Sequence, residues 1–128
     1  MSRMSTPRTV AVVGASNDRS KFGNKAVRAF RQQGYAVVPI NPHETEIEGL
    51  RAYPTLLEVP GPIDMATFYV PSEIGLRVID DVAAKRVAEV WFNPGAESPA
   101  LLARARALGL EPVLACSIMG AGASPADF

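Results

Sequence analysis

The sequence predicts an α/β domain of the doubly wound kind, in which a five-stranded parallel sheet lies between two layers of helices. Apolar runs of strand length alternate with amphipathic helical patterns, and short turn-forming segments separate them. The strand-like runs are apolar throughout, which is typical of strands covered on both faces, as in a parallel sheet. The chain has 128 residues, of which 48% are hydrophobic, and we therefore expect one domain over residues 1–128.

The first half of the chain supplies two of the five strands. The first strand is expected at Thr9–Val13, and an amphipathic helix follows at Lys25–Gln33. The second strand is expected at Tyr35–Ile40. The polar segment His43–Gly49 is expected to be a loop, and the capping-box spacing of Thr55–Glu58 predicts a short helical turn.

The second half supplies the other three strands. The third is expected at Met65–Val70, and a helix with apolar residues at helical spacing begins directly after it, at Pro71-Ser72. The fourth strand is expected at Val87–Phe92. Ser98-Pro99 predicts an N-cap followed by proline in the first turn of the next helix, and the fifth strand is expected at Pro112–Cys116.

Composition argues against several functions. The 13 basic and 13 acidic residues leave a net charge of zero, whereas nucleic-acid binders usually carry a basic face. No apolar stretch approaches the roughly 20 residues that cross a bilayer, and we expect no signal peptide. The one cysteine, Cys116, has no internal disulfide partner, which favours a reducing cytoplasm. We expect loose ends at residues 1–7 and 120–128.

The unusual loops of the chain all follow predicted strands. Right-handed crossovers place the carboxyl ends of parallel strands at one edge of the sheet, and ligands bind there, where the strand order reverses. We therefore expect four loops to meet at that edge: Gly14-Ala15-Ser16, Asn41-Pro42-His43, Val70-Pro71-Ser72 and Asn93-Pro94-Gly95.

The loop from Gly14 to Gly23 predicts a phosphate site, because a strand precedes it and a helix N-terminus follows it. Two common nucleotide patterns are nevertheless missing. The dinucleotide fingerprint G-x-G-x-x-G is absent, and strand two ends in Asn41-Pro42 rather than in an acidic residue that could hold a ribose. The Walker pattern G-x-x-x-x-G-K-[ST] is also absent.

A set of motifs in one order carries a resemblance to a known family. The motifs are Gly14-Ala15-Ser16, Lys21-Phe22-Gly23, Pro39-Ile40-Asn41-Pro42, Ile63-Asp64, Tyr69-Val70-Pro71 and Val90-Trp91-Phe92-Asn93-Pro94-Gly95-Ala96. From about Arg8 to Met119, the chain resembles the small coenzyme A-binding proteins. These are stand-alone versions of the Rossmann-like N-terminal domain of the succinyl-CoA synthetase α subunit.

The resemblance implies coenzyme A, or an acyl-CoA, as ligand. The loop Gly14–Gly23 would hold the pyrophosphate, with Ser16 and Lys21 as its main side chains. Pro42 and His43 would lie beside the adenosine and its 3′-phosphate. Val70-Pro71 would form an apolar wall for the adenine. The implied site comprises Gly14, Ala15, Ser16, Lys21, Phe22, Gly23, Asn41, Pro42, His43, Val70, Pro71, Asn93, Pro94 and Gly95, the last three along the pantetheine arm.

The chain departs from the family pattern at two places. A lysine or arginine commonly follows the Asn-Pro pair in the family, whereas this chain has His43, and histidine is only partly charged at neutral pH. Similar members also often have Asp-Arg-Cys-Ile-Met after strand five, whereas this chain has Ala115-Cys116-Ser117-Ile118-Met119.

The leading hypothesis is a coenzyme A-binding protein with no catalytic residues of its own, because the ligase domain that bears the phosphorylated histidine in the synthetases is not recognisable here. Neither the lone His43 nor the lone Cys116 offers a cluster of metal ligands, and Cys116 has no neighbouring base in the sequence. Two alternatives stay open. One is an NAD(P)-binding enzyme or redox sensor on the same fold. The other is an interaction module that docks on a synthetase-like protein or forms a homo-oligomer.

Overall fold

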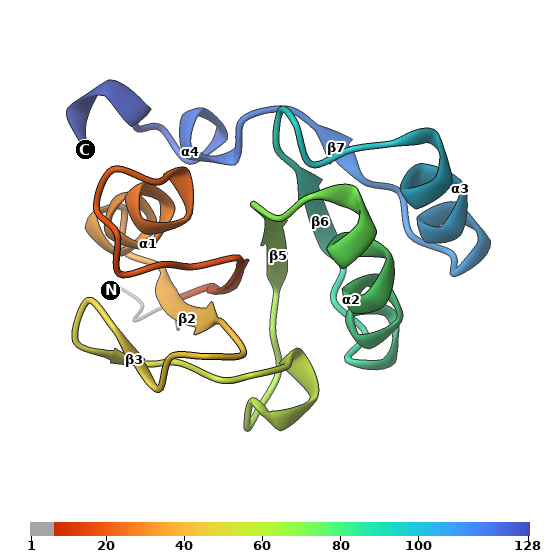
Figure 1. The fold of residues 1–128 in the computed structure, drawn as a ribbon, viewed down its shortest axis with the longest axis horizontal. Helices are drawn as coiled ribbons and strands as arrows, with labels where there is room; N and C mark the ends of the chain where they lie inside the picture. Colours follow the sequence, from red (N-terminus) through yellow and green to blue (C-terminus); the bar gives the residue numbers. More distant parts are fainter. Residues whose placement is uncertain (1–6) are drawn as a thin grey trace, which may run out of the picture.

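A five-stranded parallel sheet forms the centre of the molecule, as the sequence predicts (Figure 1). The computed structural model describes residues 7–128. The order of the strands across the sheet is β2-β1-β5-β6-β7, and all neighbours are parallel. The strands are β1 (Thr9–Val13), β2 (Ala36–Ile40), β5 (Met65–Phe68), β6 (Glu89–Phe92) and β7 (Val113–Leu114).

Helices cover both faces of the sheet, which gives the predicted three layers. The helical elements are α1 (Phe22–Gln32), α2 (Ser72–Ala84), α3 (Pro99–Ala107) and α4 (Ser117–Gly120), with the 3-10 turns η1 (Leu56–Glu58) and η2 (Pro125–Asp127). Successive residues of a strand point to opposite faces. Val10 and Val12 accordingly pack with Phe30 of α1, whereas Ala11 and Val13 belong to the core cluster of α2 and α3.

The strand order defines where a ligand would bind. From β1 the chain crosses over one face through α1 to β2, and from β5 it crosses over the other face through α2 to β6. The order therefore reverses between β1 and β5. In doubly wound sheets, the crevice beyond the carboxyl ends of two such strands is the usual ligand site.

The region between β2 and β5 differs from the prediction. The predicted polar loop at His43–Gly49 contains strand β3 (Glu46–Ile47), which pairs antiparallel with β4 (Leu50–Arg51). Ile47 is fully buried and packs on the α1 side of the core. The helical turn predicted at Thr55–Glu58 is present as η1, but the capping box is wrong, because Thr55 makes no side-chain capping hydrogen bond.

The C-terminal segment also differs from the sequence-based expectation. Strand β7 has two residues rather than the five expected at Pro112–Cys116. The segment expected to be loose from residue 120 packs on α1: Gln33 Nε2 donates to the Ala121 carbonyl over 2.8 Å, and the Arg28 guanidinium lies 5.7 Å from the centre of the Phe128 ring. The loose N-terminal end expected at residues 1–7 lies outside the described residues, apart from Pro7.

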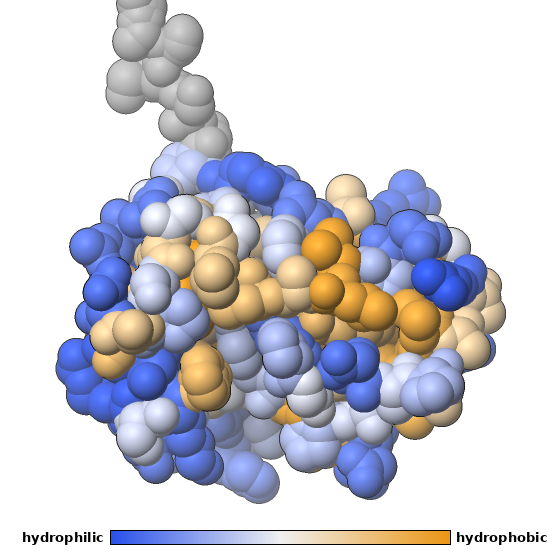
Figure 2. All heavy atoms as spheres, turned by 90° about the horizontal axis from the view of Figure 1, so that it is seen from above, coloured by the Kyte–Doolittle hydropathy of each residue, from blue (hydrophilic) through white to orange (hydrophobic). Residues whose placement is uncertain are grey.

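The surface over β7 and α4 carries a band of apolar side chains (Figure 2). Its large exposed members are Val113, Leu114 and Met119.

Within residues 7–128, no helix is both long and apolar enough to span a membrane.

Candidate functional site

A cavity of about 1030 Å³ opens at the carboxyl ends of the strands, across the β1–β5 switch point. The loops after β1, β2, β5 and β6 line it, together with one face of α2. All fourteen residues of the predicted site lie in its wall. The wall also contains residues with polar or reactive side chains that were not predicted from the sequence, notably Tyr69, Arg77, Asp81 and Cys116.

Two glycines bring the start of α1 directly onto the end of β1. Gly14 has a φ of +91°, and a Cβ there would lie 2.8 Å from the Tyr69 carbonyl oxygen. A Cβ on Gly23 would overlap the carbonyl oxygen of Gly14. A side chain at Gly23 would therefore push α1 away from β1, and a side chain at Gly14 would push apart the loops after β1 and β5. The glycines keep the first turn of α1 at the cavity wall.

The N-terminus of α1 has no cap from its own sequence. Lys21 is the N-cap residue and makes no side-chain capping bond, and no acidic residue lies in the first turn. The first N–H groups of a helix lack acceptors within the helix and carry the positive end of its dipole. The start of α3 contrasts with this arrangement, because Ser98 Oγ accepts a hydrogen bond from the Leu101 N–H there. The open α1 terminus beside Lys21 can therefore accept an anion.

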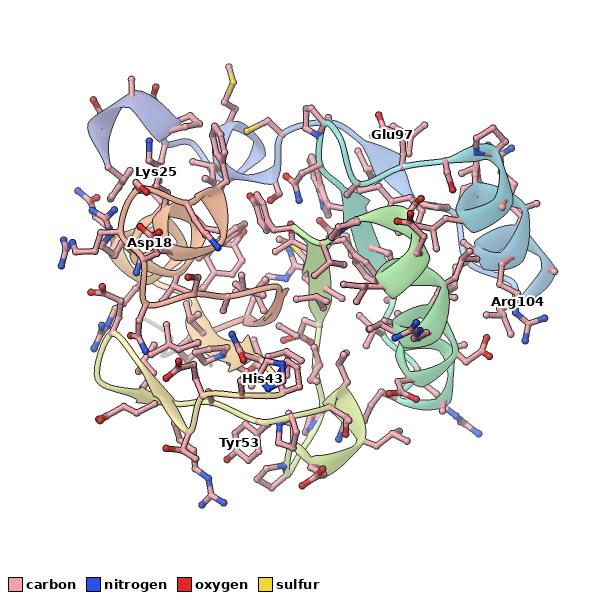
Figure 3. The ribbon with its side chains drawn as sticks, viewed as in Figure 1. Asp18, Lys25, His43, Tyr53, Glu97 and Arg104 are labelled. Atoms are coloured by element: carbon pink, nitrogen blue, oxygen red, sulfur yellow. The ribbon has the colours of Figure 1, made fainter. Side chains whose placement is uncertain are left out.

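Consecutive turns fix the loop between β1 and α1. Ser16 Oγ accepts from the Asp18 N–H at 3.0 Å, and Asp18 Oδ1 accepts from the Ser20 N–H at 3.0 Å. The hydrogen bonds from Ser20, together with the charge of Lys21, lower the pKa of Asp18. Asp18 is absent from the cavity wall and lies on the α1 side of the loop (Figure 3). Its charge is therefore held outside the cavity.

The β3–β4 hairpin supports the same loop from outside the cavity. Asn17 Nδ2 donates to the Glu46 carbonyl at 2.9 Å. The fully buried Asn24 donates through Nδ2 to the Ser16 carbonyl and to Glu48 Oε2, each at 2.9 Å. The segment His43–Gly49, which was expected to be a polar loop, thus helps to hold the predicted phosphate-binding loop in place.

Asn41 joins the loops after β1 and β2. Its Nδ2 donates to the Ala15 carbonyl at 2.9 Å, and its Oδ1 accepts from the N–H groups of His43 at 2.7 Å and Glu44 at 3.1 Å. This turn positions His43 beside the end of β2, in the cavity wall (Figure 3). The amide of Asn41 is therefore engaged within the protein.

Asn93 is the centre of a buried hydrogen-bond network beneath the cavity. Its Nδ2 donates to Thr67 Oγ1 at 2.7 Å and to the Phe68 carbonyl at 2.8 Å. Its Oδ1 accepts from the N–H of Ser117 at 2.8 Å and from the Ser117 hydroxyl at 3.0 Å. Since Asn93 donates to Thr67, the Thr67 hydroxyl is free to donate to Ser117 Oγ, 2.6 Å away, which closes a ring.

The hydroxyl of Tyr69 extends this network toward the cavity. It lies 3.0 Å from Ser117 Oγ, whose own proton goes to Asn93, so Tyr69 is the donor. Burial raises the pKa of Tyr69 to about 12. The Tyr69 phenol is thus neutral at physiological pH. The network fixes the inward direction of the Asn93 side chain, which leaves the neighbouring Pro94 and Gly95 to face the cavity.

Helix α2 adds a wall of mixed character. Ile74 and Val78 contribute apolar surface, and Arg77 and Asp81, one turn apart, contribute opposite charges. Burial, with a smaller contribution from the neighbouring Asp80, raises the pKa of Asp81. Residues 74–81 therefore offer both an apolar and a charged surface to one ligand.

Reactive groups in the described part of the chain are few. Cys116 is a half-buried free thiol in the cavity wall. No group of three or more His, Cys, Asp or Glu residues among residues 7–128 is arranged to hold a metal ion.

Comparison with known families gives a match over nearly the whole chain. A family model described as a CoA binding domain matches residues 8–121. Among curated proteins, the α subunit of an ADP-forming acetate–CoA ligase II from Pyrococcus furiosus is 36% identical over 85 residues, which are 66% of this chain. The match spans only 19% of the length of that subunit.

Solved structures give the same result for the fold. A conserved hypothetical protein from Pyrococcus furiosus matches with a TM-score of 0.82 and 34% identity, over 88% of this chain and 98% of its own. A dinucleotide-forming acetyl-coenzyme A synthetase from Ca. Korarchaeum cryptofilum, solved with phosphate and ADP, matches with a TM-score of 0.75 and 33% identity. That match covers 85% of this chain and 26% of the synthetase chain.

Proposed function

The chain belongs to the CoA binding domain family, and we propose that it binds coenzyme A or an acyl-CoA without catalysing a reaction itself. The observation that carries this proposal is the cavity at the β1–β5 switch point. It combines an uncapped helix N-terminus, an apolar wall and an Asn-Pro-Gly loop along one continuous surface. Coenzyme A has matching parts, joined in this order: an adenosine, a diphosphate and a long, uncharged pantetheine arm.

Each part of the ligand has a proposed position. The diphosphate would accept hydrogen bonds from the first N–H groups of α1 and a charge-assisted bond from Lys21. The adenine would lie against Val70 and Pro71. The pantetheine arm would follow Pro94-Gly95, through backbone contacts, because the Asn93 side chain is already fully hydrogen-bonded.

The contacts of Asn41 favour coenzyme A over a dinucleotide. A dinucleotide site uses an acidic residue after the second strand to accept hydrogen bonds from the ribose hydroxyls. Asn41 occupies this region, and its amide is committed to Ala15 and to the turn that positions His43. The residue at the end of β2 is thus an amide that is already hydrogen-bonded within the protein, and not a carboxylate.

Calorimetric titration with coenzyme A tests the proposal, with Lys21→Ala as the informative variant and Lys25→Ala as its control. Lys25 lies on the same helix but outside the cavity wall. Loss of one charge-assisted hydrogen bond should weaken binding about tenfold in Lys21→Ala. Lys25→Ala should bind as the unmodified protein does. Absence of heat at millimolar coenzyme A would rule out the function, whereas equal effects of both variants would rule out only the proposed position of the diphosphate.

The relatives suggest a protein partner as well. Because a ligase subunit and a synthetase contain this domain as a small part of a longer chain, we propose that the loaded protein docks on a synthetase-like partner. Affinity purification of the tagged chain with and without coenzyme A would test this. Failure to retain any synthetase-like protein under either condition would remove the docking proposal and leave ligand binding unaffected.

A further inference from the structure

We propose that Arg77 is a specificity-determining residue that, together with His43, receives the 3′-phosphate of coenzyme A. The inference rests on the proposed function and refines it. It assigns a second anion position in the cavity, separate from the α1 terminus, to a residue of α2. The family resemblance implies Pro42 and His43 beside the 3′-phosphate, and neither of these residues has a permanently charged side chain.

A continuous wall connects His43 to α2. Tyr53 pairs alongside the end of β2: its N–H donates to the Pro39 carbonyl at 3.0 Å, and its carbonyl accepts from the Asn41 N–H at 2.9 Å. Pro54 and Thr55 follow Tyr53 and line the cavity.

The chain then enters η1, which packs against α2. Leu56 of η1 is fully buried in the same core cluster as Ile79 and Val82 of α2. The segment that follows β2 therefore leads along the cavity wall to α2. Arg77 and Asp81 are the charged residues that α2 contributes to this wall.

The guanidinium of Arg77 is available for a ligand. Four ion pairs are present within residues 7–128, and Arg77 takes part in none of them. Asp80, three residues further along α2, is paired with Arg104 at 3.0 Å (Arg104 is labelled in Figure 3). A guanidinium keeps its charge at all physiological pH values and matches the geometry of a phosphate. Arg77 therefore provides a permanent positive charge in the cavity wall.

The number of cationic positions matches the ligand. One lies at the start of α1 with Lys21, and the other lies on α2 with Arg77. Coenzyme A has two phosphate groups of this kind, the diphosphate and the 3′-phosphate, on different atoms of one ribose. A ligand with a diphosphate alone would leave Arg77 without a partner. Asp81 faces the same space, and its negative charge opposes the attraction of Arg77 for a phosphate.

The test compares coenzyme A with 3′-dephospho-coenzyme A in titrations of the unmodified protein, Arg77→Gln and Asp81→Asn. Arg106→Gln is the control, because Arg106 lies on α3 in an exposed ion pair with Glu111, outside the cavity wall. We expect Arg77→Gln to weaken coenzyme A binding about tenfold and to change 3′-dephospho-coenzyme A binding less than about twofold. Asp81→Asn should change the preference in the opposite direction, by about threefold. Arg106→Gln should change neither.

The outcomes separate the inference from the proposed function. If the unmodified protein binds both ligands equally, or if Arg77→Gln weakens both alike, the 3′-phosphate assignment is wrong and coenzyme A binding stands. If the protein binds neither ligand, both proposals fall. Arg77 is exposed, so its substitution is not expected to unfold the chain, and an unchanged thermal melting curve would verify this.

Discussion

Replacing Asn93 with alanine should destabilise the fold by about 3 kcal/mol, although the residue lies in a loop of the ligand cavity. The side chain is almost completely buried and makes four hydrogen bonds. Alanine would leave the Phe68 carbonyl and the Ser117 N–H without their side-chain partners, at about 1–3 kcal/mol for each buried polar group. For a domain of this length, about 3 kcal/mol corresponds to a melting temperature lowered by roughly 10 °C.

Denaturant unfolding and thermal melting would measure this loss, with Asn17→Ala as the matched control. Asn17 also donates two hydrogen bonds, to Glu44 and to the Glu46 carbonyl, but at the surface. The same chemical change there should cost less than about 1 kcal/mol, because water replaces the lost partners. If Asn93→Ala were as stable as Asn17→Ala, the buried network would not be a source of stability, and Asn93 would be free for a ligand.

Two further predictions concern the cavity wall. Gly23→Ala should destabilise the protein by about 2 kcal/mol and weaken coenzyme A binding at least tenfold, because the new Cβ would overlap the Gly14 carbonyl. Helix propensity alone predicts the opposite, a gain in stability of about 1 kcal/mol. If denaturant unfolding showed that the variant is more stable, the close approach of Gly23 to Gly14 would be refuted. Burial raises the folded-state pKa of Tyr69 to about 12, so the stability that its neutral form contributes is complete below about pH 10 and is lost as the pH rises to 12. The free energy of unfolding of the unmodified protein, relative to that of Tyr69→Phe, should fall by about 1 kcal/mol per pH unit between pH 10 and pH 12. If the free energies of unfolding of the two proteins changed with pH in parallel, the raised pKa of Tyr69 would be contradicted.

The sheet and its helices could be predicted from the sequence because burial on both faces leaves long, uninterrupted apolar runs. Val10–Val13 and Met65–Phe68 are buried at every position, and their boundaries differ little from the prediction. The β3–β4 hairpin could not be found in this way, since each of its strands has two residues. A single buried side chain, Ile47, is too short a pattern to show a period of two.

The position of the candidate cavity could also be predicted from the sequence. The contacts that each of its side chains makes could not. Topology alone brings the loops after parallel strands to one edge, which is why all the predicted residues meet in one cavity. The inward direction of Asn93 depends on Ser117, which is 24 residues away in the sequence. Arg77 lies on the polar side of an amphipathic helix, where sequence alone cannot distinguish a ligand contact from a solvated charge.

The two halves of the proposed site are stabilised in different ways, and this has a consequence for its evolution. At α1, the backbone makes the site: two glycines set the approach of helix to strand, and side chains outside the cavity hold the loop. At α2, the side chains of exposed positions make it, and Arg77 can change without repacking the core. The diphosphate position is therefore expected to resist substitution. The proposed contact of Arg77 with the 3′-phosphate would supply from α2 a charge that His43 replaces in the loop after β2, where the family commonly has a lysine or arginine.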